Sequence, residues 1–276
     1  MEKKKTPIGI FDSGFGGLTV YREIRGLLPE YDYLYLGDNA RSPYGTRSFD
    51  IIYRYTLQGV KALLNAGCPL VILACNTASA KALRSIQQRD LKGEYKERRV
   101  LGVIRPSVEK LGQLSKTGKI GLFGTTGTVR SNSYELELQK LYPAAELFQE
   151  ACPMWVPLVE NNEIHTPAAA YFVRRHVDNL LSRDPAIDTI ILACTHYSLL
   201  IPLIKEYIPE TVQLVDQGPL VAGRLQDYLY RHPEIEEHCS KTRDERFLTT
   251  AFVPDFGAVY GMLFNDPVHA EHIDLY

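Results

Sequence analysis

Residues 71–79 read VILACNTAS, and residues 190–198 read IILACTHYS. Each stretch runs through apolar residues to a cysteine, Cys75 or Cys194, and then turns polar at once. Short apolar runs of this kind are typical of buried strands in parallel sheets. Residues 76–90 have the composition of a helix. The pattern therefore predicts that each cysteine lies at the carboxyl end of a strand, with Cys75 close to a helix N-terminus.

Similar short apolar runs alternate with longer amphipathic stretches along most of the chain, which predicts an α/β fold with mainly parallel sheets. The first run, PIGIFDSG at residues 7–14, turns at a glycine-rich segment into a helical pattern that Pro29 closes. Ser48 and Thr166 are expected to begin helices, and Gly67 to end one.

The chain repeats its own pattern once. KIGLFGTTGTV at 119–129 aligns with PIGIFDSGFGG at 7–17, and the two cysteine segments align at a similar offset. The repeat predicts two pseudo-symmetric α/β domains, each of three layers. Elements after residue 213 are too few for a third domain and are expected to return to the first. The expected domains are residues 1–103 plus 214–276, and residues 104–213.

Composition restricts the class of protein. The chain has 276 residues, 45% of them apolar, a net charge of −2 and a pI near 6.4. These values give no reason to expect a nucleic-acid or membrane partner. The chain lacks an apolar run of about 20 residues, and its first eleven residues lack the apolar core of a secretory signal, so a cytoplasmic location is expected.

Cysteine usage points to reduced thiols rather than disulfides or a metal. The chain is too large for a disulfide scaffold, and its cysteine count of five is odd. It contains neither a Cys-x-x-Cys pair nor a His-Glu-x-x-His motif, so we expect no metal site. Cys68, Cys152 and Cys239 are interpreted as packing residues.

The two strand-end cysteines have a second interpretation, because ligands of open α/β sheets bind at the carboxyl ends of strands. A thiol reacts as the thiolate, and a helix N-terminus supplies only about 0.3 to 1 kcal/mol, less than the 1.36 kcal/mol of one pKa unit. A proton-accepting neighbour is therefore needed. His196 is the candidate for Cys194 and Asp12 for Cys75, although His196 can equally be structural and Asp12 a turn former.

The glycine-rich turns indicate a small ligand. DSGFGG at 12–17 has Thr19 where a dinucleotide-binding turn has its third glycine, and neither it nor GTTGTVRS at 124–131 is a P-loop. Such turns, and SPYG at 42–45, can still present backbone N–H groups to a small anion. Nearby donor side chains would be those of Ser13, Asn76, Thr77, Thr125, Thr128 and Thr195. We expect a small, polar, carboxylate-bearing ligand.

Five motifs in register, FDSGFGGLTV, YLGDNARSPYGTRS, ILACNTASA, PLVE and ACTHYSLL, closely resemble the glutamate racemases of the aspartate/glutamate racemase family. The resemblance covers nearly the whole chain. It implies two facing domains with the active site in the cleft between them, and cofactor-independent interconversion of L- and D-glutamate for peptidoglycan synthesis. An acid and a base are needed on opposite faces of one carbon, and two thiols can exchange these roles.

Carried over position by position, the resemblance makes Cys75 and Cys194 the catalytic acid and base. Asp12 would assist the first thiol, and Glu160 and His196 the second. The expected substrate-binding residues are Asp12, Ser13, Pro43, Tyr44, Gly45, Asn76, Thr77, Thr125, Thr128, Thr195 and His196. No cofactor or metal is implied, and a homodimer is among the expected states.

The chain departs from the family pattern at Arg105, where an acidic residue is usual, and at Ala193 and Ser198, where Gly and Pro are common. Arg105 has the alternative reading of a surface ion pair. Three other functions stay open: racemisation of aspartate or another small amino acid, hydrolysis by a Cys194–His196 pair, and non-catalytic amino-acid binding.

Overall fold

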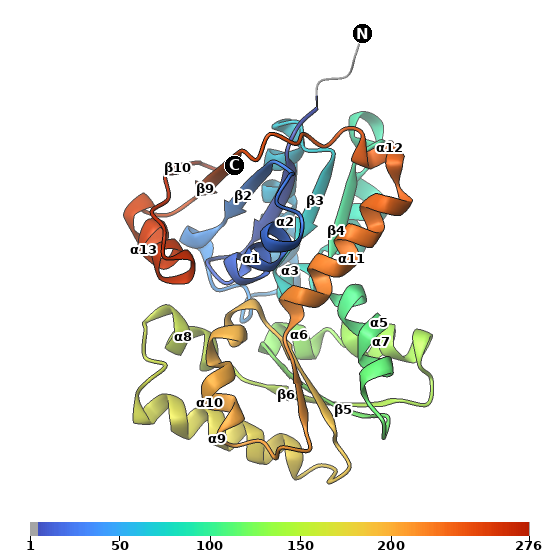
Figure 1. Ribbon diagram of the computed structural model, residues 1–276, viewed down its shortest axis with the longest axis vertical. Coiled ribbons are helices and arrows are strands. Elements are labelled where there is room, and N and C mark those ends of the chain that lie inside the picture. The colour runs from blue at the N-terminus through green and yellow to red at the C-terminus, as the bar shows by residue number, and fades with distance from the viewer. Residues whose placement is uncertain (1–4, 276) are drawn as a thin grey trace.

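Residues 5–275 are described by a computed structural model, in which the strands form two separate parallel sheets (Figure 1). The first sheet has six strands in the order β10-β9-β2-β1-β3-β4. Their bounds are β1 Ile8–Asp12, β2 Tyr33–Gly37, β3 Leu70–Leu73, β4 Arg99–Gly102, β9 Glu245–Thr249 and β10 Ala270–His272. The expected return of the chain to the first sheet is thus made by β9 and β10.

The second sheet has four strands in the order β6-β5-β7-β8. Their bounds are β5 Lys119–Gly124, β6 Glu146–Ala151, β7 Thr189–Ala193 and β8 Gln213–Val215. The two sheets are built alike: β1 lies between β2 and β3, and β5 lies between β6 and β7. The strand that precedes each strand-end cysteine is therefore a direct neighbour of the central strand. The expected boundary between residues 213 and 214 falls inside β8, which pairs with β7.

Helices cover both faces of each sheet. The α-helices are α1 Gly17–Leu27, α2 Phe49–Asn65, α3 Asn76–Lys81, α4 Leu83–Ser85, α5 Ile104–Leu114, α6 Thr126–Arg130, α7 Ser133–Leu141, α8 Trp155–Glu160, α9 Pro167–Leu181, α10 Ile201–Lys205, α11 Gln217–Arg231, α12 Pro233–Glu236 and α13 Val253–Phe264. Shorter turns are η1 Asn39–Arg41, the π-turn η2 Ile86–Asp90, η3 Gly93–Tyr95 and η4 Thr195–Leu200.

Strand alternation decides which side chains meet which helices. In β1, Ile8 and Ile10 pack with α1, α11 and α13, whereas Phe11 faces the opposite cluster with α2 and α3. The second sheet has one cluster with α8, α9 and α10 and another with α5 and α7. Each sheet is therefore the middle of three layers, because successive side chains point to opposite faces.

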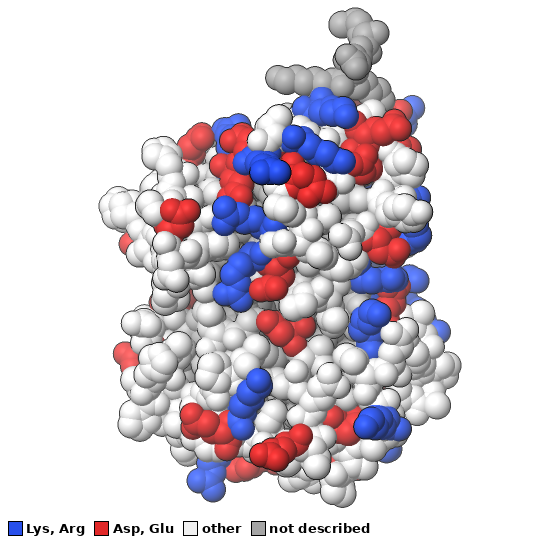
Figure 2. Space-filling model, viewed as in Figure 1, with Lys and Arg blue, Asp and Glu red and all other residues white. Residues whose placement is uncertain are grey.

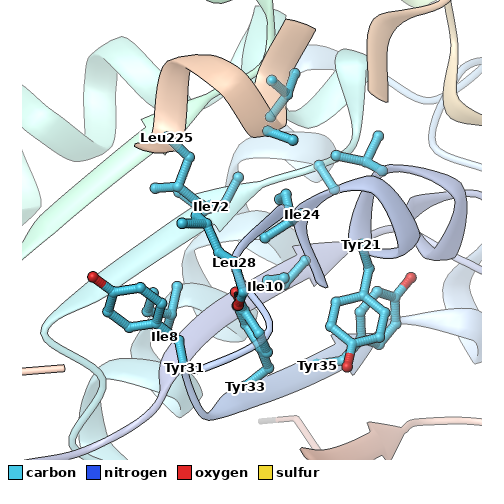
Figure 3. Close-up of a cluster of buried hydrophobic side chains, with 14 of the residues drawn as sticks. Ile8, Ile10, Tyr21, Ile24, Leu28, Tyr31, Tyr33, Tyr35, Ile72 and Leu225 are labelled. Atoms are coloured by element: carbon cyan, nitrogen blue, oxygen red, sulfur yellow. Dashed lines mark hydrogen bonds between the residues drawn. The ribbon is translucent and has the colours of Figure 1, made fainter. Parts of the chain in front are cut away.

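Tyrosines pack among isoleucines and leucines in the larger core of the first sheet (Figure 3). The ring of Tyr21, on α1, lies 5.5 Å from that of Tyr33 and 6.0 Å from that of Tyr35, in tilted and edge-on geometry. Such aromatic pairs are stabilising beyond their burial by about 0.5–1.5 kcal/mol each. This core fixes α1 against β1 and β2, and so fixes the turn that joins β1 to α1.

Local signals were correct at all three helix termini, but they did not locate the breaks within a longer helical stretch. Thr166 Oγ1 accepts a hydrogen bond from the Ala169 backbone N–H at 3.3 Å, and Gly67 ends α2 with φ +100°. Ser48 precedes α2 but makes no side-chain cap bond. The helix expected over residues 76–90 is not continuous, since it divides into α3, α4 and a π-turn.

The described surface mixes charges of both signs (Figure 2). Arg105 forms an exposed ion pair with Glu109 one helical turn away, with Nε and Oε1 3.0 Å apart. That pair agrees with the surface alternative for this residue. Within residues 5–275, no helix is long and apolar enough to cross a membrane.

Candidate active site

Cys75 lies where the first sheet meets α3. β3 ends two residues earlier, and the cysteine is the N-cap of α3, with its Sγ 3.4 Å from the Ala78 backbone N–H. The Ser13 hydroxyl lies 3.2 Å from the same sulfur. Asp12 ends β1, the strand beside β3, so the parallel register brings it to the same edge. The Cys75 sulfur, the Ser13 hydroxyl and Asp12 therefore lie at one edge of the first sheet.

Cys194 occupies the matching place in the second sheet. β7 ends at Ala193, and η4 begins at Thr195. Cys194 Sγ lies 3.9 Å from His196 Nδ1, and His196 Nε2 lies 3.2 Å from Glu160 Oε1. This chain of three side chains leads from the sulfur to a carboxylate at the end of α8.

The Glu160 carboxylate also contacts the first sheet's half of the molecule, because its Oε1 accepts a hydrogen bond from Ser42 Oγ at 3.1 Å. The loop at residues 42–45 therefore reaches across to the second half.

Both cysteines line one cavity of about 620 Å³, a volume that includes its opening to solvent. That size lies within the range of small-molecule sites. The predicted residues that line it are Ser13, Pro43, Tyr44, Gly45, Cys75, Asn76, Thr77, Thr125, Cys194, Thr195 and His196. Further lining residues are Ser42, Thr46, Thr126, Cys152, Pro153, Val156 and Pro157.

Three of the predicted residues do not line the cavity. Asp12 is fully buried behind it, with Oδ1 accepting the Gly14 N–H at 2.9 Å and Oδ2 without a protein partner. Thr128 lies behind Thr125, whose Oγ1 it approaches to 3.1 Å. Glu160 does not reach the cavity itself but contacts His196, which lines it. These residues can support the site, but they do not face the cavity.

The loop with Tyr44 and Gly45 is held closely. The Tyr44 hydroxyl donates to the buried Asp38 carboxylate, which also accepts hydrogen bonds from Arg41 and Thr250. The Gly45 carbonyl accepts from the Gly127 N–H at 2.8 Å, and a Cβ on Gly45 would lie 2.8 Å from the Thr125 Cβ. Glycine at position 45 is thus required by the close approach of the two halves of the protein.

The electrostatic surroundings of Cys75 favour its protonated form. Burial, and then the negative charge of Asp12, raise the pKa of Cys75 to about 12. Burial also raises the pKa of Asp12, because its carboxylate loses solvent. At neutral pH Cys75 is therefore an S–H group.

The surroundings of His196 favour the opposite charge state. Burial lowers the pKa of His196, but hydrogen bonds and charge from Cys194 and Glu160 outweigh it and raise the pKa to about 10. For Glu160, burial is outweighed by its hydrogen bond with His196, so its pKa lies below the usual range. At neutral pH the imidazole is therefore a cation between a carboxylate and a sulfur.

Sequence reasoning missed three residues of this region. Cys152, which was interpreted as packing only, also lines the cavity beside Cys194. Asp38 holds Tyr44, and its position directly after β2 was a usable signal. Gln217 contacts Asn76 from 141 residues away, and nothing local in the sequence marks it. Among the described residues, no three His, Cys, Asp or Glu side chains gather as a metal site.

Comparison with known proteins identifies the family. The model of the Asp/Glu/Hydantoin racemase family matches residues 9–224. The chain is 37% identical over 272 residues to the glutamate racemase of Streptococcus thermophilus, covering 98% of this chain and 96% of the relative.

Solved structures agree with this relationship. The glutamate racemase of Bacillus anthracis superposes with a TM-score of 0.90 at 33% identity, covering 99% of this chain and 98% of that one. The Francisella tularensis glutamate racemase in complex with D-glutamate has a TM-score of 0.85 at 29% identity, covering 100% and 99% of the two chains. The family model and these relatives show that the chain, with its two parallel sheets and two cysteines on one cavity, belongs to the Asp/Glu/Hydantoin racemase family.

Proposed function

We propose that this protein interconverts L- and D-glutamate without a cofactor, with Cys75 and Cys194 as acid and base. The observation that carries the proposal is that two thiols from two different sheets line one small cavity. Full-length relatives named glutamate racemase support glutamate as the substrate. The D-glutamate would serve peptidoglycan synthesis, and the reduced thiols suit a cytoplasmic enzyme.

The charge states of Cys75 and His196 suit this chemistry. Cys75 is held as a thiol, and the cationic His196 can pair with a thiolate on Cys194. One enantiomer would lose its α-proton to the Cys194 thiolate, and the electron pair left on the α-carbon would delocalise into the substrate carboxylate. Cys75 would then donate its proton to the opposite face. The reaction leaves the thiol and the thiolate exchanged, so the reverse reaction starts from that state.

Hydroxyl groups around the cavity would hold the substrate carboxylates. Thr77 Oγ1 and Thr125 Oγ1 lie 2.9 Å apart across the two halves of the site, so one small ligand can reach both. Donors fixed in advance stabilise the charge that develops on the carboxylate during proton removal. Ser13 approaches the sulfur of Cys75 and can donate to the substrate or to the thiolate.

The domains of the protein are proposed to follow the two sheets. Residues 5–103 with the segment after β8 would form one domain, and residues 104–215 the other. Support comes from the strand orders, in which no strand of one sheet pairs with a strand of the other within the described residues.

The deciding experiment is incubation of each glutamate enantiomer in deuterated water. We expect the optical rotation of either enantiomer to decay to zero and deuterium to enter the α-position. Cys75→Ala and Cys194→Ala should each abolish racemisation. Cys239→Ala is the matched control, because that buried cysteine lies outside the cavity.

Three results would redirect the assignment. Normal turnover by Cys75→Ala would rule out the two-thiol mechanism and favour a Cys194–His196 hydrolase. Racemisation of aspartate but not of glutamate would change the assigned substrate from glutamate to aspartate. Tight glutamate binding without α-proton exchange would indicate a binding protein. Added pyridoxal phosphate should leave the rate unchanged.

A further inference from the structure

Two consecutive residues at the second crossover between the sheets reach both halves of the site. Asp216 and Gln217 lie between β8 and the body of α11. Gln217 contacts Asn76, the residue after the first catalytic thiol, and Asp216 contacts Ser198, in the turn that follows the second. The crossover therefore touches the polypeptide directly behind each cysteine.

The Gln217 contact is a pair of amides. Asn76 Nδ2 donates to Gln217 Oε1 at 2.6 Å, and Gln217 Nε2 lies 3.2 Å from Asn76 Oδ1. The Gln217 nitrogen is also 2.7 Å from Ser107 Oγ and 2.6 Å from Tyr134 Oη. Tyr134 in turn donates to Asn76 Oδ1 at 2.7 Å. No side chain in this cluster is more than 2% exposed.

Burial makes this cluster costly to disturb. A buried polar group left without its partner costs about 1–3 kcal/mol, and Gln217 is the member that contacts all of the others. Ser107 lies on α5, just after the first crossover between the sheets, so the cluster ties the two crossovers together. Asn76 is the first residue of α3, and the Ala78 N–H of that helix contacts Cys75 Sγ. A shift of Asn76 would therefore turn the thiol.

The Asp216 contact is a single hydrogen bond to the turn after Cys194. Ser198 Oγ donates to Asp216 Oδ1 at 2.7 Å. Asp216 precedes α11 but makes no cap bond to that helix. Its carboxylate is instead used to hold η4, the turn that carries His196.

We propose that Asp216 and Gln217 are a positioning pair that sets the separation of the two thiols across the α-carbon. The inference rests on the proposed two-thiol racemisation. If one contact of the pair is broken, the thiol beside that contact is displaced, whereas the other thiol still removes the α-proton from its own face. A displacement of about 1 Å can cost about a hundredfold in rate. The carbanion then persists longer, so the thiol that took the α-proton exchanges it for solvent deuterium and returns deuterium to the face that lost the proton.

The test compares two rates in deuterated water, starting from each glutamate enantiomer in turn. One is the entry of deuterium into the remaining substrate, and the other is the formation of the opposite enantiomer. We expect Gln217→Met, which keeps length but loses the amide, to lower kcat by about a hundredfold and to raise the ratio of exchange to racemisation several-fold for the enantiomer whose α-proton Cys194 removes. Ser198→Ala loosens the turn after Cys194, so it should raise the ratio for the other enantiomer, and by less, because its bond is only partly buried.

Gln213→Met is the matched control, since Gln213 begins β8 and is exposed. It should leave kcat and the ratio at their wild-type values. A purely structural role for Gln217 predicts fewer folded molecules and an unchanged ratio. The proposal is overturned if the ratio of exchange to racemisation stays at the wild-type value in both Gln217→Met and Ser198→Ala. If Gln217→Met does not fold, the ratio measured for Ser198→Ala decides the question. A wild-type protein that neither racemises nor exchanges glutamate would instead overturn the proposed function.

Discussion

Replacing Glu160 by glutamine would remove the negative charge that faces His196 and keep a side chain of the same length. In the native protein Glu160 Oε1 lies 3.2 Å from His196 Nε2. The pKa of His196 is raised there from 6.5 to about 10. The substitution therefore tests whether the carboxylate keeps the imidazole charged.

The size of the effect follows from the geometry. At 3.2 Å and an effective dielectric constant of about 20, two unit charges attract by about 5 kcal/mol. This equals nearly 4 pKa units, which is an upper limit, because the Glu160 side chain is 22% exposed and is therefore screened. Cys194 also stabilises the imidazolium and remains in the variant. We expect the pKa of His196 to fall by about 2 units, to near 8.

Titration of the histidine ring resonances by NMR measures this directly, with the His196 signal assigned by its loss in His196→Asn. Stability provides a second measurement. The raised pKa of His196 contributes stability that is fully present below pH 6.5 and is lost as the pH rises through about 10. In Glu160→Gln the loss should come about 2 units lower, so urea unfolding at pH 9 should separate the two proteins.

Activity gives an internal check. The variant should lose kcat/KM between pH 7 and pH 9, where the wild type keeps it. Because the enantiomers have equal free energy, kcat/KM must fall equally for L- and D-glutamate. Glu163→Gln is the control, since it removes the same charge from an exposed position on the same segment. A His196 pKa in Glu160→Gln within about half a unit of the wild-type value would refute the reasoning.

Two further substitutions test packing around the site. Gly16→Ala would place a methyl group 2.3 Å from Thr195 Oγ1 and 2.4 Å from His196 Nδ1, so kcat/KM should fall by about a hundredfold. Normal kinetics in Gly16→Ala would contradict this, and Gly26→Ala, which meets nothing within 4 Å, is its control. Trp155→Ala removes a fully buried ring and should cost about 3–5 kcal/mol of unfolding free energy in urea. A loss below about 1 kcal/mol would be inconsistent with that burial.

Much of the architecture could be predicted from periodicity. The apolar runs before Cys75 and Cys194 are strands of two parallel sheets, and the internal repeat corresponds to the equivalent central positions of β1 and β5. These predictions succeeded because strand period and turn chemistry are local properties. Residues 76–90 are helical nearly throughout, as their composition indicates, but composition did not locate the breaks that divide them into α3, α4 and a π-turn.

By itself the sequence determined the kinds of residue in the site. An apolar run that ends in a cysteine indicates a thiol at the carboxyl end of a strand, where ligands of α/β sheets bind. Only the tertiary structure decided the partners of these residues. It brings Glu160 to His196 from 36 residues away and Gln217 to Asn76 from 141 residues away. It also places Cys152 on the cavity and Asp12 behind it. Such contacts depend on how two sheets and their crossovers pack in space, and no local pattern in a single sequence records that packing.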